Sequence, residues 1–250
     1  MLATGAAQAA SVSYDLTLSN DPWNIYIPDG TAYAQVTIDD NSGDGLINFT
    51  VTILDSILSQ SAGPNFGLQS FGFNAVDGSA AANLGVPNIV GLGGGALPTG
   101  WSADVNHYVA PPPGGTGIAL DGWGKFDAAV SDGGSNRLNP TLTFSVDLAD
   151  DAISDYIVGS DGGANGSLLF AAHIVGFNDL NPNAPADDPY DGTGLCYDMN
   201  PPDENWTLDC NILTSTWVSG GTQNVIPVPA AAWLFGSALC LLGWVRRRAA

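Results

Sequence analysis

Short runs of alternating hydrophobic and polar residues dominate the chain. The two clearest runs are residues 31–38 and 46–53, and the turn-rich segment DDNSGDG at 39–45 separates them. Because side chains point alternately to the two faces of a β-strand, such runs predict strands with one buried face. A short polar connection between them predicts a β-hairpin. The side chains expected on its buried face are those of Val36, Ile38, Ile47, Phe49, Val51 and Ile53.

Similar runs recur along the chain up to residue 177. We expect further strands at residues 13–18, 68–74, 123–130, 141–148 and 167–177. Clusters of glycine, proline, asparagine and aspartate separate them, as turns require. Only residues 150–157 suggest a short helix, with Asp150 capping its start. Many short strands without strand–helix alternation predict an all-β domain over residues 11–222, an antiparallel β-sandwich of jelly-roll type.

The pattern changes near the C-terminus, where residues 230–245 form an unbroken apolar run that ends at Arg246, Arg247 and Arg248. A helix of that length spans about 24 Å, slightly less than the roughly 30 Å hydrocarbon core of a bilayer. A basic cluster after an apolar span favours a cytoplasmic C-terminus and places the preceding residues outside. The run therefore predicts one C-terminal transmembrane helix. A buried core helix with a basic end is the alternative.

This tail resembles a known sorting signal. Pro227, Val228, Pro229 and Ala230, followed by AAWLFGSAL and the arginines, are similar to the PEP-CTERM signal of Gram-negative bacteria. The family's name refers to Pro-Glu-Pro, and this chain has Val228 in place of the glutamate. The resemblance covers residues 223–250 and implies recognition by an exosortase, a membrane-embedded cysteine transpeptidase. Processing near residues 227–230 would then follow, with the ectodomain released or re-anchored outside the cell.

A second resemblance lies in the ectodomain. The phrases FGFN at 71–74, DGWGKFD at 121–127 and FAAHIVGF at 170–177 are similar to those of an uncharacterised group of PEP-CTERM proteins. This resemblance implies no activity. Gly72, Gly122 and Gly124 stand beside aromatic residues in these phrases, which is typical of bulges or of closely packed strand crossings.

Export also agrees with the N-terminus and with the cysteines. Ala7-Gln8-Ala9 is a small-x-small pattern of the kind that signal peptidase cuts, so we expect residues 1–10 to be the remnant of a signal peptide. An alanine-rich N-terminal extension is the alternative. Cys196 and Cys210 flank a short loop, and an oxidising compartment favours a disulfide between them over half of a zinc site.

The net charge is strongly negative. The chain has 25 acidic and 5 basic residues, a formal charge of −20, and three of the basic residues are the terminal arginines. Such a surface repels nucleic acid and anionic lipid, because both are polyanions. It is compatible with a divalent cation or a basic partner, and most of its aspartates are explained by solvation alone.

One acidic segment has the spacing of a calcium loop. Asp40, Ser42, Asp44 and Asn48 occupy positions 1, 3, 5 and 9 of such a loop, with glycine at position 6. The usual glutamate at position 12 is replaced by Val51, and strands rather than helices flank the segment. Ca²⁺ binding is one hypothesis for this segment, and a polar hairpin turn is the other.

Aromatic residues near strand ends suggest a sugar-binding surface. Trp23, Trp101 and Trp123 could offer flat faces for stacking on pyranose rings. Tryptophans that close the ends of a sandwich core are the alternative.

The sequence contains no G-x-S-x-G, H-E-x-x-H or phosphate-loop motif, and His173 lies in an apolar run where a half-buried strand histidine is the usual explanation. We therefore expect no enzymatic activity. The interpretation is an exported surface or matrix protein with a structural or adhesive role in exopolysaccharide or biofilm. Two alternatives remain, a carbohydrate-binding module and a secreted polysaccharide hydrolase whose two carboxylates the sequence does not single out.

Overall fold

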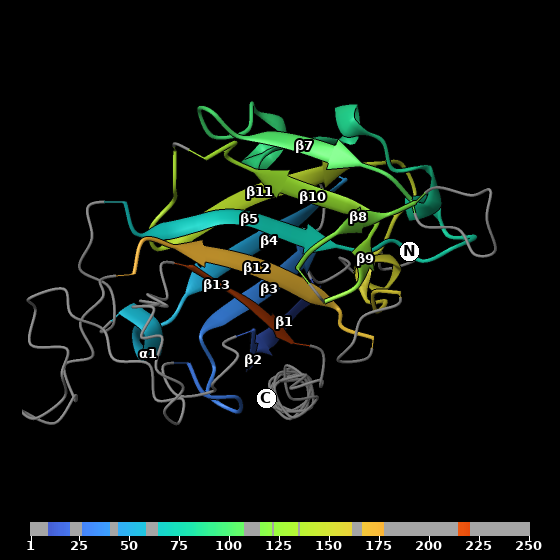
Figure 1. Ribbon diagram of the computed structural model, residues 1–250. Helices are drawn as coiled ribbons and strands as arrows, with labels where there is room; N and C mark the ends of the chain where they lie inside the picture. Colours follow the sequence, from blue (N-terminus) through green and yellow to red (C-terminus); the bar gives the residue numbers. More distant parts are fainter. Residues whose placement is uncertain are drawn as a thin grey trace, which may run out of the picture.

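Two antiparallel sheets stacked face to face form the body of the protein (Figure 1). The computed structural model describes residues 10–20, 27–40, 45–58, 65–107, 116–121, 123–134, 136–161, 167–177 and 215–220. Within these residues the strands pair antiparallel throughout, which confirms the predicted all-β class.

The first sheet has five strands. Their order is β1 (Ala10–Leu16), β3 (Ala34–Asp40), β4 (Leu46–Ile53), β11 (Thr141–Asp147) and β6 (Ile89–Gly91). The predicted hairpin is its centre, since β3 pairs with β4 and Val36 lies opposite Val51 while Ile38 lies opposite Phe49. The buried face is the one that the alternation predicts.

The second sheet has six strands and faces the viewer in Figure 1. Their order is β2 (Leu18–Ser19), β13 (Ser215–Gly220), β12 (Phe170–Val175), β5 (Gly67–Phe73), β10 (Ala128–Ser131) and β7 (Ser102–Val105). A two-stranded ladder, β8 (Ile118–Ala119) with β9 (Lys125–Phe126), lies in front of it. The described helices are single turns: α1 (Asp55–Leu58), η1 (Ala80–Asn83), η2 (Val86–Asn88), η3 (Leu92–Gly94) and η4 (Ile153–Tyr156).

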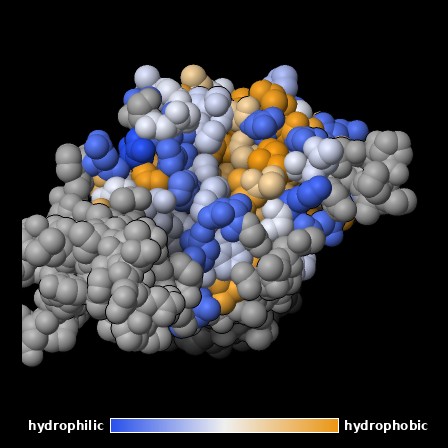
Figure 2. Space-filling model, in the orientation of Figure 1, coloured by the Kyte–Doolittle hydropathy of each residue, from blue (hydrophilic) through white to orange (hydrophobic). Residues whose placement is uncertain are grey.

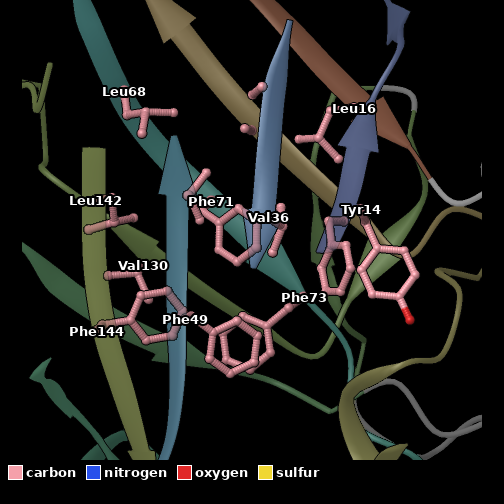
Figure 3. Close-up of a cluster of buried hydrophobic side chains, with 14 of the residues drawn as sticks. Tyr14, Leu16, Val36, Phe49, Leu68, Phe71, Phe73, Val130, Leu142 and Phe144 are labelled. Atoms are coloured by element: carbon pink, nitrogen blue, oxygen red, sulfur yellow. The ribbon is translucent and has the colours of Figure 1, made fainter. Parts of the chain in front are cut away.

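Aromatic rings from both sheets fill the space between them (Figure 3). Phe49 of β4 stacks on Phe144 of β11, with 4.9 Å between ring centroids, and lies 5.0 Å from Phe73 of the other sheet. All three rings are fully buried, as is Phe71. Each such ring contributes roughly 1.5–3 kcal/mol relative to an exposed position, so this cluster is the main tie between the sheets.

The helix predicted at residues 150–157 is a single turn, and its predicted cap is wrong. Asp150 has a left-handed φ of 65° in the preceding turn and does not cap the helix. The Oδ2 atom of Asp155 instead accepts a hydrogen bond from the Ala152 amide at 3.2 Å. An aspartate inside the first turn thus binds the amide of Ala152, the N-cap residue of the helix.

Several predictions concern residues outside those described. They are the signal-peptide remnant predicted at 1–10, of which only residue 10 is described, the sorting segment at 223–250 and the transmembrane helix at 230–245. Among the residues that the structure does describe, no helix is long and apolar enough to cross a membrane.

Candidate functional site

The outer face of the six-stranded sheet carries two parallel rows of side chains. Strand alternation puts them there, because their neighbours along each strand point into the core. The pairing register defines the first row as Ser219, Ala171, Gly72, Ala129 and Asp104. It defines the second as Trp217, His173, Ser70, Ser131 and Ser102.

The β8–β9 ladder covers the middle of the first row, at Ala171 and Gly72. Leu120, Trp123 and Phe126 form a small hydrophobic cluster with Ala171 and Leu168 on this face. A Cβ atom at position 72 would lie 2.2 Å from Leu120 Cδ1, so only glycine lets the ladder approach this closely. This contact confirms the close-packed crossing that the sequence predicts at Gly72.

Two stacked rings stand in the second row. The rings of His173 and Trp217 are neighbours on adjacent strands, with centroids 4.6 Å apart and planes 6° from parallel. Both side chains are half-buried, so part of each ring lies at the surface. We call this pair the His173–Trp217 platform. Figure 2 shows the same face, where a band of intermediate hydropathy runs across the strands beside hydrophobic surface near β8.

A carboxylate is tethered next to the platform. Asp121 is exposed in the turn between β8 and β9, and its Oδ2 atom accepts a hydrogen bond from Asn20 Nδ2 at 2.5 Å. The Oδ1 atom of Asn20 in turn accepts from the Trp217 amide at 2.8 Å and from the Thr216 hydroxyl at 3.0 Å. Asn20 therefore fixes the turn carboxylate to the strand that carries the tryptophan.

The electrostatics favour a neutral histidine. Burial lowers the pKa of His173 below its ordinary value of 6.5. The carboxylates of Asp121 and Asp132 oppose this decrease in pKa, and the guanidinium of Arg137 adds to it. At neutral pH the platform thus offers an uncharged imidazole, with one donor and one acceptor, stacked on an indole.

The chemistry available here is recognition of a flat ring. Aromatic faces attract C–H bonds and cations, and the carboxylate and imidazole next to them can orient hydroxyl or amino groups. Beyond His173, the row continues with the short side chains of Ser70, Ser131 and Ser102. No long side chain of this row therefore stands above the sheet at these three positions. An extended ligand could therefore continue along the row.

A second polar cluster holds loops together. Asp127 is buried and accepts the Ala75 amide at 2.9 Å, while its own amide donates to Asn74 Oδ1 at 3.1 Å. His107 Nδ1 lies 4.0 Å from the Asp127 carboxylate, and its Nε2 atom lies 2.8 Å from the Leu84 carbonyl oxygen. Main-chain partners account for most of these contacts, so we assign this cluster a structural role.

A third cluster lies at the end of the core. The hydroxyl of Tyr156 donates to Asp151 Oδ2 at 2.6 Å, and burial raises the pKa of both groups. The nearby carboxylates of Asp155 and Asp40 add to the increase in the pKa of Asp151, and the hydrogen bond from Tyr156 opposes it. The pair closes the end of the core over the Phe49 ring, which lies 5.6 Å from Tyr156.

The calcium hypothesis loses one of its four ligands. Asp40 pairs with Ile47, whose side chain is buried in the core, so Asn48 points to the opposite face of the sheet. The Asn48 Oδ1 atom accepts from the Ser145 hydroxyl at 2.6 Å. Ser42 and Asp44 lie outside the described residues, and within those described no group of three acidic, histidine or cysteine side chains could hold a metal ion. Ca²⁺ binding by Asp40, Ser42 and Asp44 stays a prediction.

Two of the tryptophans proposed for sugar stacking are buried. Trp101 is 7% exposed, with its indole nitrogen donating to the Asn136 carbonyl at 2.7 Å, and Trp123 is 1% exposed beneath the β8–β9 turn. Their rings are packing surfaces, as the alternative reading of the sequence has it. Trp23 lies outside the described residues, as do Cys196, Cys210 and the sorting signal at 227–230 with its arginines at 246–248.

The sequence did not point to the platform. Trp217 lies in a short run of serine, threonine and glycine without clear alternation. The half-buried strand histidine that the sequence predicts at position 173 is confirmed, but its stacking partner is not predictable from the sequence. A pairing of strands some 40 residues apart in sequence brings the two rings together. Searches for similar proteins found no matching family model, no matching curated protein and no matching solved structure.

Proposed function

We propose that the chain is an exported protein of the cell surface or extracellular matrix, with a structural or adhesive role in exopolysaccharide or biofilm. The observation that carries the proposal is the C-terminal segment, in which Pro227, Val228, Pro229 and Ala230 precede an apolar run and three arginines. Its resemblance to the PEP-CTERM signal makes an exosortase the expected partner. The precursor would be held in the inner membrane by residues 230–245, with the ectodomain outside.

The jelly-roll type is part of the proposal. The successive strands β4, β5, β6 and β7 alternate between the two sheets. Further along the chain, β10 and β12 belong to the six-stranded sheet, while β11, which lies between them in sequence, belongs to the five-stranded sheet. Such repeated crossings are typical of Greek-key connections, of which jelly rolls are built. A two-sheet body of this kind offers broad, stable faces for contacts in a matrix.

Cell fractionation of the native host tests the sorting. The wild-type chain is expected in the external fraction, and a Pro227→Ala, Pro229→Ala variant is expected to remain in the membrane. Pro98→Ala, which changes a proline of the ectodomain, is the matched control and should be exported normally. A host without its exosortase should retain the wild-type chain as well. Normal export of the double variant, or of the wild type in that host, would contradict the proposal.

A second candidate function is carbohydrate binding. The His173–Trp217 platform favours it, with a tethered carboxylate and a row of serine hydroxyls beside it. The tryptophans that the sequence suggested for this role are different ones, and the two that are described are buried. This function is compatible with the first, because a matrix protein that binds polysaccharide is adhesive.

A further inference from the structure

We propose that the His173–Trp217 platform binds an amino-sugar polymer with free amino groups, and that Asp121 accepts the hydrogen bonds of the ammonium. The inference rests on the proposed extracellular role, since the face meets such polymers outside the cell. It goes further by naming the chemical class of the polysaccharide and the residues that select it.

The shape of the face favours a sugar ring. Two parallel rings at 4.6 Å form a rigid, half-buried block on the outer face of the sheet, and Ser70 beside them is short and buried. A pyranose ring can pack against the exposed part of the aromatic rings while its hydroxyls reach the serines and the imidazole. Because the row crosses several strands, a linear polymer could place successive rings along it.

The charge decides which sugars fit. The chain carries −20 overall, so a polymer of uronic acids is repelled before it reaches the face. At mildly acidic pH, where its amines are protonated, a polymer of glucosamine carries one ammonium per ring and is attracted. The same attraction over the whole surface raises the rate of encounter and has no counterpart for neutral sugars.

The carboxylate next to the platform supplies the local selection. Asp121 is exposed, and within the described residues its Oδ1 atom has no hydrogen-bond partner, while Oδ2 is held by Asn20. An ammonium at this position would donate a charge-assisted hydrogen bond to Asp121. The neutral state of His173 keeps a competing positive charge off the platform.

Calorimetric titration of the full-length chain in detergent tests the proposal. The probes are the hexamers of glucosamine, of N-acetylglucosamine and of galacturonic acid, and hexalysine. We expect the glucosamine hexamer to bind at least about tenfold more tightly than the acetylated hexamer, as one charge-assisted hydrogen bond implies. Galacturonate and hexalysine should bind more weakly still, hexalysine because it has no ring to pack on the platform.

Three variants separate the contributions. Trp217→Ala should weaken binding of the glucosamine hexamer and of the N-acetylglucosamine hexamer by about tenfold or more, because it removes the stacking ring. Asp121→Asn should weaken binding of the free-amine hexamer by about tenfold and leave the acetylated hexamer unchanged. Asp104→Asn removes an exposed carboxylate from the first row of the same sheet and should change affinity by less than about twofold.

Other results would overturn the proposal. Equal affinity of wild type and Asp121→Asn for the glucosamine hexamer would show that the Asp121 carboxylate does not bind the ammonium. Because Asp121 is exposed, this substitution leaves the fold intact. Equal binding of hexalysine would assign the face to basic peptides, and tighter binding of galacturonate would reverse the charge argument. Absence of binding by folded wild-type protein would overturn the inference while leaving the sorting proposal to the fractionation experiment.

Discussion

At the scale of single residues, strand alternation decides which polar side chains can act together. Asn48 and Asp40 are close in sequence and point to opposite faces of their sheet, whereas Trp217 and His173 are distant in sequence and stack. The sequence pattern identifies alternation well, so it predicts the face of the sheet to which Asn48 points. It does not predict which strands pair with one another, because pairing depends on contacts between segments far apart in the chain.

His173 should make stability depend on pH. Burial lowers its pKa in the folded state below the unfolded value of 6.5, so the unfolded chain binds a proton more readily. The stabilising contribution is therefore complete above pH 6.5 and is lost as the pH falls through 6.5 towards the folded pKa. Asp121, Asp132 and Arg137 are the charged groups that act on this pKa.

Urea unfolding between pH 7.5 and pH 5.5 measures this effect. The unfolding free energy of the wild type should decrease more over this range than that of His173→Gln, which cannot titrate. Parallel curves for the two proteins would show that His173 has an ordinary pKa in the folded state.

Trp101 and Trp123 provide a matched pair for hydrogen bonding. Both are buried, and the Trp101 indole donates to Asn136, whereas the Trp123 indole nitrogen has no partner within the described residues. Substitution by phenylalanine removes a hydrogen bond in the first case and an unpaired donor in the second. Trp101→Phe should therefore lose about 1 kcal/mol more stability than Trp123→Phe. Chemical denaturation checks the difference, and a larger loss for Trp123→Phe would contradict it.

At the scale of elements, the strands of seven or eight residues were predictable, whereas the six-residue β13 and the two-residue strands were not. Residues 46–53 and 141–148 coincide with β4 and β11 to within one residue, because long alternation is a strong signal. The two-residue strands β2, β8 and β9 have no periodicity to detect. In the segment 123–130, which we read as one strand, Asp127 interrupts the ladder and separates β9 from β10.

The β8–β9 ladder should depend on Gly72. An alanine there would place its Cβ 2.2 Å from Leu120 Cδ1 and 3.3 Å from Phe126 Cγ, so the Leu120 side chain would have to shift and the packing of the ladder would loosen. We expect Gly72→Ala to cost about 1–3 kcal/mol of stability. Gly85→Ala, whose Cβ would have no contact closer than 3.4 Å, is the control and should cost less. Thermal unfolding of both variants measures the costs, and equal costs would show that the ladder yields freely.

Cys196 and Cys210 are expected to form a disulfide in the exported protein. Closing a loop of this length stabilises by roughly 3 kcal/mol through the unfolded chain. A thiol titration of the denatured, unreduced external form should find no free thiol, because processing removes Cys240 with residues 230–250. Two free thiols would contradict the pairing.

At the scale of the whole molecule, two properties combine. The body is a two-sheet fold with a continuous aromatic core, and its composition is strongly acidic. High net charge keeps a protein soluble and resists association with polyanions, while it attracts cationic partners. The overall class and the charge follow from composition and pattern, but the place where a ligand would bind depends on how the β8–β9 turn sets Asp121 beside β13.

The most direct test of the central claim is the intact mass of the protein from the culture supernatant and from the membranes of its own host. The account predicts an external form that lacks residues 230–250 and begins near residue 10. A full-length chain that keeps its tail and remains in the membrane would instead be a simple anchored protein, and processing by an exosortase would be contradicted.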